Sequence, residues 1–580
     1  MASGARRWVV ADADEGAAAA LVRRLGLHPL AARVLAGRGL ADPGAAARFL
    51  APRLEDLPDP LSMKGMDAAV ERLVRAVEAG EPITCYGDYD VDGVTSTALL
   101  AGFLEAAGAR VGTYTPHRLV EGYGLNTAAV ERLAAGGTRV LVSLDCGITS
   151  VAEVDAARRL GVDAVIVDHH TVPVELPAAA AILNPHQPGC GYPTKHLAAV
   201  GVTFNLVVAL RRRLRERGRF GAGRPEPNLR DALDLVALGT IADVVPLVGA
   251  NRILVRFGLE ELRRESRPGV RELKRVAGVA AGAPVTAGQV GFRLAPRINA
   301  AGRLDDAGRG VRMLLARDEG TAAPLAEALD RENRARQEIE RRMLEEALAD
   351  AAAHVEGGAR GLVLFREGWH PGVVGIVASR VVERFHRPAV LVGVADGVGK
   401  GSGRSIEGFH LYDALAACAA HLDRFGGHRH AAGVTIDPSA LPAFREAFER
   451  HAAERLAEED LVPRTRVEGF VEADQLDERA ASDLERLAPF GAGNPEPVFG
   501  MRARPQRARR VGADGVHLKL QLADRDAIGF SLGGLLPVCD GPVEAAVTLG
   551  FDEWDGARRL QLKVRDLRRA GAPRGATPSP

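Results

Sequence analysis

The sequence contains few cysteines, few aromatic residues and no long apolar run. Its five cysteines are scattered and form no close Cys-x-x-Cys pair, which argues against a disulfide framework or a structural zinc site. No stretch approaches the roughly 18 apolar residues typical of a membrane span, and no apolar core with a cleavage site follows the N-terminus. These absences predict a soluble, cytoplasmic protein in a reducing compartment, without a membrane partner.

The net charge of the chain is zero, because 75 basic residues balance 75 acidic residues. Any binding of nucleic acid must therefore come from local basic surface rather than from overall charge. Only six of the 75 basic residues are lysines, so the remaining 69 are arginines. Arginine suits bidentate contact with phosphate, although a coding bias toward Ala, Gly and Arg explains the excess at least as well. Composition alone predicts no DNA partner.

The 580 residues exceed what one hydrophobic core usually supports, so roughly three or four domains are expected. Between residues 82 and 245, short apolar runs alternate with helical patterns, which is typical of a parallel sheet built from βαβ units. The expected strands are 83–86, 111–114, 140–144 and 164–167. The fold class is therefore α/β, and the connections at the carboxyl ends of these strands should meet at one edge of the sheet.

The sequence pattern of the rest of the chain predicts further helices, strands and domains. A long helix is expected near 319–355, then a second, smaller α/β unit with strands at 362–365 and 389–394 and a helix after Gly375. Short alternating strands such as 516–522 and 544–551 indicate a small β barrel. The predicted organisation is an N-terminal helical segment 1–75, a parallel-sheet domain 76–318, a connecting helix 319–357, a smaller α/β domain 358–458, a barrel 459–570 and a disordered tail 571–580.

Three acids directly follow the first expected strand. The segment Cys85-Tyr-Gly-Asp-Tyr-Asp-Val-Asp-Gly93 places Asp88, Asp90 and Asp92 in one turn, where they would repel one another unless a cation neutralised them. A solvated acidic loop or a helix N-cap explains one such aspartate more easily than three. The pattern indicates a metal site.

Two further strands end in the same way. Asp145 follows one in Ser-Leu-Asp-Cys-Gly, and Asp168, His169 and His170 follow the next. Each group alone is weak evidence, since a lone Asp often caps a helix and a lone His is more often structural. Asp243 adds an acid to an otherwise apolar stretch, where burying an unpaired charge is costly. Together these residues predict one site.

Several carboxylates with one or two imidazoles favour Mg²⁺ or Mn²⁺ over zinc, and the histidines favour Mn²⁺. We expect two divalent cations. Two ions about 3.5–4 Å apart can generate hydroxide, hold the attacking and leaving oxygens and neutralise a phosphate. The sequence therefore predicts phosphoester hydrolysis.

The motif Asp-His-His at 168–170, preceded by Asp-Tyr-Asp-Val-Asp-Gly and Asp-Cys-Gly, resembles the DHH phosphoesterases. Further motifs resemble the RecJ branch of that superfamily over roughly 8–567. They are Pro-Arg-Ile-Asn-Ala-Ala-Gly-Arg-Leu at 296–304, Gly-Trp-His-Pro-Gly-Val-Val-Gly at 368–375, Gly-Ser-Gly-Arg-Ser at 401–405, Gly-Gly-His-Arg-His-Ala-Ala-Gly at 426–433 and Pro-Phe-Gly-Ala-Gly-Asn-Pro-Glu-Pro at 489–497.

The resemblance implies roles for these residues. The implied metal ligands are Asp88, Asp90, Asp92, Asp145, His169 and Asp243. Asp145 is expected to bridge the ions and His170 to face the scissile phosphate. Asp168 is expected to orient a histidine, since imidazoles bound to metal usually donate their other nitrogen to a carboxylate or carbonyl.

Other residues are candidates for binding phosphate. The turn with Gly426, Gly427 and His428 could bring backbone amides and an imidazole to a phosphate, as could Ser402 with Arg404. Glycines in turns more often serve backbone conformation alone. Arg118, Arg297 and Arg303 are candidates for gripping the terminal phosphate of the substrate, with ordinary ion pairing as the alternative.

The barrel resembles an OB fold, whose usual role is to track a single strand with basic grooves and stacking rings. The basic run 501–510 is the best candidate for such a surface, with a solvated loop as the alternative. The RecJ resemblance implies a monomeric 5′→3′ exonuclease specific for single-stranded DNA. It would release mononucleotides in DNA repair and recombination, with a single-strand-binding protein and a helicase as possible partners.

Three other functions remain open at this point. Asp90-Val-Asp-Gly-Val-Thr95 superficially matches the nucleophile loop of haloacid dehalogenase phosphatases, which form an aspartyl-phosphate. Smaller DHH relatives cleave oligoribonucleotides or cyclic dinucleotides, but they generally lack the added β domain. A non-catalytic DHH-fold replication scaffold is the third alternative, although the complete ligand set favours catalysis.

Overall fold

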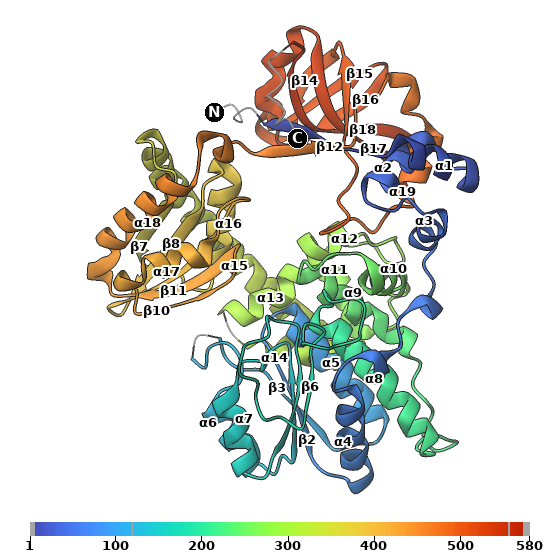
Figure 1. Ribbon diagram of the computed structural model, residues 1–580, viewed down its shortest axis with the longest axis vertical. Helices are drawn as coiled ribbons and strands as arrows, with labels where there is room; N and C mark the ends of the chain where they lie inside the picture. The colour runs from blue at the N-terminus through green and yellow to red at the C-terminus, as the bar shows by residue number, and fades with distance from the viewer. Residues whose placement is uncertain (1–5, 119, 305, 555–556, 572–580) are drawn as a thin grey trace. The chain divides into compact units, whose positions relative to one another are not determined.

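The computed structural model describes residues 6–118, 120–304, 306–554 and 557–571 (Figure 1). The chain divides into two compact units. One contains Met1–Ala51, Ile339–Ala488 and Glu496–Pro580, and the other contains Pro52–Glu338 and Pro489–Pro495. Within the described residues, none of the helices combines the length and apolarity needed to span a bilayer. The predicted disorder at 571–580 falls almost entirely on 572–580, outside the described residues.

A five-stranded parallel sheet forms the centre of the unit that contains Pro52–Glu338. Its strand order is β3-β2-β4-β5-β6, with β2 at Ile83–Gly87, β3 at Val111–Tyr114, β4 at Val140–Leu144, β5 at Asp163–Val167 and β6 at Ala181–Leu183. The four predicted strands are present, and β6 extends the sheet. The short, nearly continuous apolar runs fit a parallel sheet that is buried on both faces.

Helices cover both faces of this sheet. Val142 and Leu144 of β4 pack in one core with helices α4 (Met66–Ala79), α5 (Val91–Ala106) and α8 (Ala199–Glu216). Leu141 packs on the opposite face with α6 (Thr127–Ala135) and α7 (Val151–Arg159). The remaining helices of the unit are α9 (Leu233–Ala242), α10 (Gly249–Arg264), α11 (Pro268–Val276), α12 (Ala287–Gln289), α13 (Ala295–Leu304) and α14 (Gly308–Leu315).

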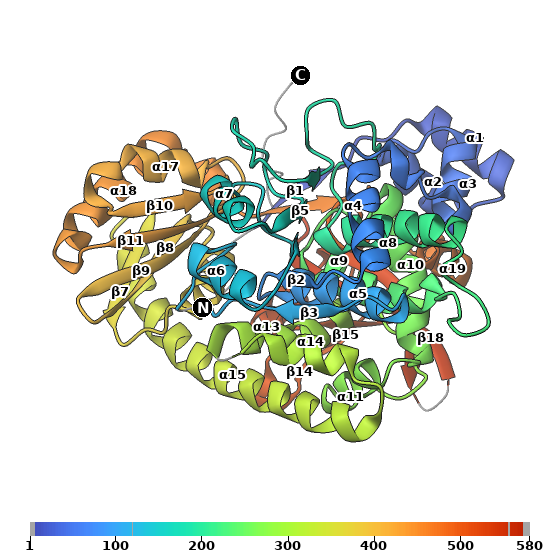
Figure 2. The same ribbon diagram turned by 90° about the horizontal axis from the view of Figure 1, so that it is seen from below.

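Helix α15 (Glu319–Glu356) is the long helix expected from the sequence (Figure 2). Its C-terminal half packs on the sheet of the smaller α/β domain through Met343, Ala347 and Ala351. That sheet has the order β10-β11-β9-β8-β7, in which only β7 and β8 pair in parallel. Its strands are β7 (Leu362–Glu367), β8 (Ala389–Ala395), β9 (Val398–Arg404), β10 (Arg424–Gly427) and β11 (Ala431–Ile436), and its helices are α16 (Val374–Phe385), α17 (Leu411–Ala417) and α18 (Leu441–Arg455).

The C-terminal β domain is a six-stranded sheet in the order β13-β17-β18-β16-β15-β14. The strands are β13 (Phe499–Ala503), β14 (Gln506–Val511), β15 (His517–Leu522), β16 (Arg525–Gly529), β17 (Val543–Trp554) and β18 (Ala557–Arg569), preceded by β12 (Arg464–Val467) and α19 (Glu478–Glu485). Alternating burial along β15, with Leu518, Leu520 and Leu522 facing the core, explains why the sequence pattern predicted strands here.

The N-terminal residues belong to the same unit as this β domain. Strand β1 (Arg7–Val10) pairs in parallel with β12, and helices α1 (Glu15–Leu25), α2 (Pro29–Gly37) and α3 (Pro43–Leu50) follow. The indole Nε1 of Trp8 donates a hydrogen bond to Asp566 Oδ2 at 2.7 Å. The predicted helical segment 1–75 is therefore divided between the two units, and its first described element is the strand β1.

Candidate metal centre

The acids predicted from the sequence lie where neighbouring strands end. Asp88 follows β2 and Asp145 follows β4. Backbone hydrogen bonds continue the sheet past these ends, because the Asp88 N–H donates to the Leu144 carbonyl at 3.1 Å and the Asp145 N–H donates to the Val167 carbonyl at 2.9 Å. The two side chains are therefore held on adjacent strands, and both are buried.

Asp90 and Asp92 lie at the start of α5. Asp90 caps the helix, since its Oδ1 accepts hydrogen bonds from the N–H groups of Asp92 and Gly93. Buried Asp92 accepts from the Ala199 and Val200 N–H groups, at 2.6 and 2.8 Å, at the first turn of α8. A Cβ at Gly93 would lie 2.4 Å from the Asp88 carbonyl oxygen, so this turn requires glycine.

These side chains converge with residues from distant segments. Three groups have potential ligand atoms that lie within 4.8 Å of one another: Asp88, Asp90 and Asp145; Asp145, His169 and His170; and Asp92, His169 and Asp243. The groups share members, so they form one continuous cluster. All six expected ligands lie in this cluster, although the identity of each ligand remains a prediction.

Four buried atoms of the cluster lack a hydrogen-bond partner among the described residues. They are Asp88 Oδ1, Asp145 Oδ1, His169 Nε2 and Asp243 Oδ2. His169 Nε2 lies 3.2 Å from Asp145 Oδ1, 3.6 Å from Asp243 Oδ2 and 3.9 Å from Asp92 Oδ2. Buried polar atoms without partners are costly. This set of oxygen and imidazole donors fits divalent cations such as Mn²⁺ or Mg²⁺.

The electrostatics of the cluster also favour the binding of divalent cations. Burial, followed by repulsion from neighbouring carboxylates, raises the pKa of Asp88 and of Asp145 well above the usual range for aspartate. Burial lowers the pKa of His169 to about 4, which keeps its imidazole neutral. A neutral imidazole is the form that binds metal. A bound cation would therefore stabilise the ionised form of these buried carboxylates.

Asp168 holds the second histidine. Its carboxylate accepts hydrogen bonds from the Ile148, His169 and His170 N–H groups. His170 Nδ1 lies 2.7 Å from Asp168 Oδ1, so this nitrogen is committed to the carboxylate. Burial alone would lower the pKa of His170, but the hydrogen bond and charge of Asp168 raise it to about 9. The geometry suits the orienting role expected for Asp168.

The three candidate arginines near the site differ in their surroundings. The Arg118 guanidinium lies 4.8 Å from the ring centre of Tyr89, a residue of the turn that carries Asp88. Burial raises the pKa of Tyr89 to about 12, and the charges of nearby Arg118 and Arg303 oppose part of this shift. Arg297 instead donates to Asp330 Oδ1 at 2.9 Å and to the Arg293 carbonyl. Arg297 is thus engaged in structural hydrogen bonds, and its role toward phosphate remains a prediction.

The other phosphate-binding candidates lie in the smaller α/β domain. Ser402 pairs with Gly433, and Gly433 pairs with Gly426, across three adjacent strands. Arg404 donates to Ser402 Oγ at 2.9 Å. The other two candidates, Gly427 and His428, end β10 and begin the turn into β11. The structure places four of these candidates in one sheet and His428 in the turn that follows β10, all in the unit that does not contain the metal cluster.

Three residues near the cluster were missed by the sequence reasoning. The Tyr123 hydroxyl donates to the Asp145 carbonyl at 3.2 Å and lies 3.3 Å from His170 Nδ1. Asn184 Nδ2 donates to the His170 carbonyl, and Asn299 Oδ1 accepts from the Val91 N–H. Asn299 lies within the quoted motif at 296–304, and Asn184 directly follows β6, which was not predicted. No signal in the sequence distinguishes Tyr123.

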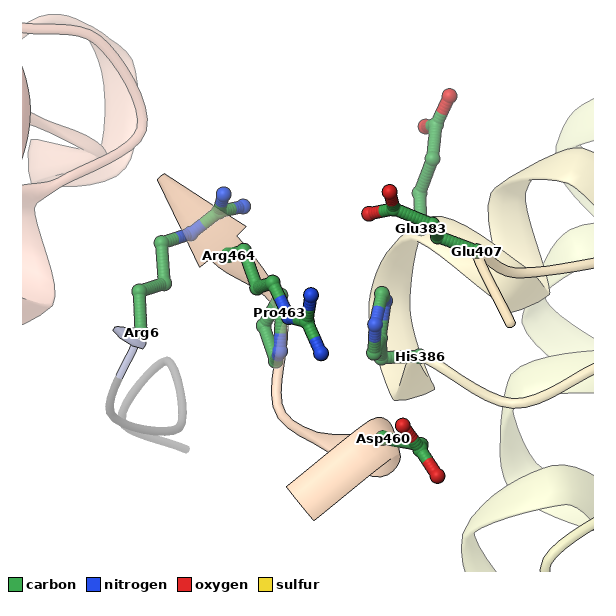
Figure 3. A pocket seen from close by; sticks show the side chains of 7 residues that line it. All are labelled: Arg6, Glu383, His386, Glu407, Asp460, Pro463 and Arg464. Carbon is green, nitrogen blue, oxygen red and sulfur yellow. The ribbon is translucent and has the colours of Figure 1, made fainter. Parts of the chain in front are cut away.

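A separate pocket of about 280 Å³ lies in the unit that contains the β domain (Figure 3). It is lined by Arg6, Glu383, His386, Glu407, Asp460, Pro463 and Arg464. Charges of both signs face this pocket, and it contains none of the predicted site residues. It therefore contributes nothing to the metal cluster.

Comparison with known protein families assigns three segments of the chain to known domains. Residues 82–240 match the DHH family, N-terminal domain, residues 358–454 match the DHHA1 domain, and residues 467–566 match the RecJ OB domain. The predicted fold class, a parallel-sheet DHH domain with a second α/β domain and an OB-like domain, is confirmed.

Curated relatives and solved structures match nearly the whole chain. The chain is 41% identical to the single-stranded-DNA-specific exonuclease RecJ of Dickeya dadantii, covering 93% of this chain and 96% of the relative. It is 37% identical to the RecJ of Bacillus subtilis, covering 98% and 71%. Crystal structures of RecJ from Thermus thermophilus with Mn²⁺ and with Mg²⁺ match with TM-scores of 0.85 and 0.78. Their sequence identities are 34% and 32%, and the matches cover 98% of this chain and 81% and 79% of those chains. The chain belongs to the RecJ family of DHH proteins.

Proposed function

We propose that this protein is a single-stranded-DNA-specific exonuclease that hydrolyses phosphodiester bonds with two divalent cations, Mn²⁺ or Mg²⁺. The observation that carries the proposal is the convergence of four buried, unpartnered ligand atoms from four separate segments. Membership of the RecJ family supports the substrate class. It also supports 5′→3′ release of mononucleotides and a role in DNA repair and recombination.

The residues of the cluster would bind the two cations as two sets of ligands. Asp88, Asp90 and Asp145 would hold one cation, and Asp92, His169 and Asp243 would hold the other, with Asp145 bridging them. Asp145 belongs to the first group, and its Oδ1 lies 3.2 Å from His169 Nε2 of the second group, which supports the bridging role. When bound, the two cations would activate water and neutralise the scissile phosphate.

The remaining polar residues would handle the substrate. His170, held by Asp168, would present its imidazole to the scissile phosphate and stabilise the charge that develops there. Arg118 and Arg303 would bind phosphate near the cluster. The candidates of the DHHA1 domain, Ser402, Arg404, Gly426, Gly427 and His428, would bind the end of the strand.

The family resemblance also supports less direct proposals. The protein would act as a monomer in the cytoplasm, with a single-strand-binding protein and a helicase as partners. The domain boundaries predicted from the sequence, 76–318 for the catalytic domain, 358–458 for the DHHA1 domain and 459–570 for the OB-like domain, are retained as a working division.

Digestion of end-labelled DNA tests the proposed function. We expect Mn²⁺-dependent release of the 5′-labelled mononucleotide from single strands, no attack on blunt duplex, and loss of activity in Asp145→Asn. Glu131→Gln, which removes an exposed carboxylate on α6, is the matched control and should retain full activity. Equal digestion of duplex, or full activity of Asp145→Asn, would overturn the assignment.

A further inference from the structure

The motif at 489–497 lies outside the metal cluster and outside the set of phosphate-binding candidates. Its residues Pro489–Pro495 nevertheless belong to the unit that contains the metal cluster. The chain on either side of them, Ile339–Ala488 and Glu496–Pro580, belongs to the other unit. This short segment, which we call the 489–495 turn, therefore has its packing contacts in the unit of the metal cluster.

The 489–495 turn is closed by its own hydrogen bonds. The Gly491 N–H donates to the Asn494 carbonyl at 2.9 Å, and the Asn494 N–H donates to the Gly491 carbonyl at 3.1 Å. The Asn494 side chain is buried, and its Nδ2 donates at 2.8 Å to the first carbonyl of the turn. Paired hydrogen bonds around two central residues are typical of a tight turn with one conformation. Ala492 and Gly493 form its tip.

The tip of the turn contacts Pro246 and Leu247. The Leu247 N–H donates to the Ala492 carbonyl at 2.8 Å. A Cβ at Gly493 would lie 2.8 Å from Pro246 Cβ, and a Cβ at Gly491 would lie 2.8 Å from Leu247 Cδ1. Carbon atoms in contact normally stay about 3.5–4.0 Å apart. A side chain at either glycine would therefore push the two segments apart.

Pro246 and Leu247 belong to the short connection that begins with Asp243. Residues 243–248 alone join helices α9 and α10. Leu247 is buried, and the Asn251 side chain donates to the Pro246 carbonyl at 3.0 Å. The far end of the connection is thus held both by the 489–495 turn and by α10.

The near end of the connection is strained. Val244 has a φ of +61°, a conformation that β-branched residues rarely adopt. Val244 is also 69% exposed, so the packing of its own side chain does not hold it there. Such a conformation persists only where the surrounding structure enforces it. On one side the Asp243 N–H donates to the Gly239 carbonyl at 2.9 Å, and on the other side the constraint comes from Pro246 and Leu247.

We propose that the 489–495 turn positions Asp243 as a ligand of the metal centre. By holding Pro246 and Leu247, the turn keeps the strained link in place. The Asp243 carboxylate then stays in the cluster, where its Oδ2 lies 3.6 Å from His169 Nε2. The turn acts only through the connection and is not itself a ligand. The inference rests on the ligand role of Asp243 in the proposed function and extends that role to a distant segment of the chain.

Binding of Mn²⁺, measured by isothermal titration calorimetry, tests the proposal without relying on catalysis. Gly493→Ala should weaken one of the two Mn²⁺ sites by about 10–100-fold, the range typical for groups that orient metal ligands. It should also lower kcat at limiting Mn²⁺ and leave KM for oligo(dT) unchanged. Gly491→Ala, whose Cβ would meet only the Leu247 side chain, should weaken the same site less.

Gly218→Ala is the matched control, because Gly218 has a φ of +71° in the same unit but no neighbouring atom within 4 Å of its Cβ position. It should bind Mn²⁺ like wild type, whereas Asp243→Asn shows full loss of the site. Circular dichroism in chelator identifies the variants that fold, and Gly491→Ala provides the test if Gly493→Ala does not fold.

Unchanged Mn²⁺ affinity in every folded variant of the turn, while Asp243→Asn loses a site, would overturn the proposal and leave the turn a structural anchor. Absence of Mn²⁺ binding by the wild-type protein would instead overturn the proposed function.

Discussion

Removal of divalent cations should destabilise the unit that contains the metal cluster. In metal-free protein, four buried polar atoms have no partner among the described residues. Each such atom costs about 1–3 kcal/mol, so the set costs roughly 4–12 kcal/mol. Protonation of the buried carboxyls relieves part of this cost, because burial and neighbouring carboxylates raise the pKa of Asp243 to about 9.

The expected gain on adding Mn²⁺ can be calculated. A cation present at 100 times its dissociation constant stabilises the folded state by about 2.7 kcal/mol. For a domain of this size, each kcal/mol raises the midpoint of thermal unfolding by about 2–4 °C. Saturation of one site should therefore raise the midpoint by roughly 5–10 °C, and a second site should add to that shift.

The effect should also depend on pH. The pKa of Asp92 is raised to about 7 and that of Asp243 to about 9, by burial first and by neighbouring carboxylates second, from an ordinary value of 3.8. The folded metal-free protein thus binds more protons than the unfolded chain between about pH 4 and 9. Stability from these groups is complete below pH 3.8 and is lost as pH rises through 7 and 9. Mn²⁺ should therefore stabilise more strongly at pH 8.5 than at pH 6.

Differential scanning calorimetry with chelator and with Mn²⁺ measures this shift. Asp145→Asn should abolish most of the stabilisation by Mn²⁺, while Glu131→Gln on α6 should respond like wild type. An unfolding midpoint that is insensitive to Mn²⁺ at pH 8.5, or an unchanged response in Asp145→Asn, would refute the reasoning.

Three further substitutions follow from individual contacts. Asp168→Asn should lower kcat by about 10–100-fold while Mn²⁺ still raises the unfolding midpoint, because Asp168 orients His170; loss of Mn²⁺ binding in kinetic and calorimetric assays would contradict that role. Gly93→Ala should reduce both stability and activity, because its Cβ would lie 2.4 Å from a backbone oxygen; wild-type unfolding and kcat would be the contrary result. Trp8→Phe should lower the free energy of unfolding by about 1.5–3 kcal/mol, since it removes the hydrogen bond to buried Asp566; denaturant titration measures the loss, and a change below 0.5 kcal/mol would speak against it.

Elements with strong local patterns were predictable from the sequence. The expected strand at 140–144 coincides with β4, and the expected helix at 319–355 differs from α15 by one residue. The missed elements are either very short or depend on distant partners. Strand β6 has only three residues, and β1 pairs with β12 more than 450 positions away. Such pairings leave no local signal, because the stabilising contacts come from another part of the chain.

The metal cluster was predictable for a related reason. The carboxyl ends of parallel strands meet at one edge, so acids after β2, β4 and β5 could be expected to lie together. The supporting contacts could not be predicted in this way. Tyr123 approaches His170 from a loop, and Asp92 is held by the first turn of α8. These contacts depend on tertiary packing rather than on spacing along the chain.

Anomalous scattering at the manganese edge, from crystals of the full chain soaked in Mn²⁺, tests the existence of the two-ion centre most directly. The account predicts two anomalous peaks about 3.5–4 Å apart, both within bonding distance of the Asp145 carboxylate. Absence of peaks at this cluster, or manganese bound only elsewhere in the chain, would contradict it.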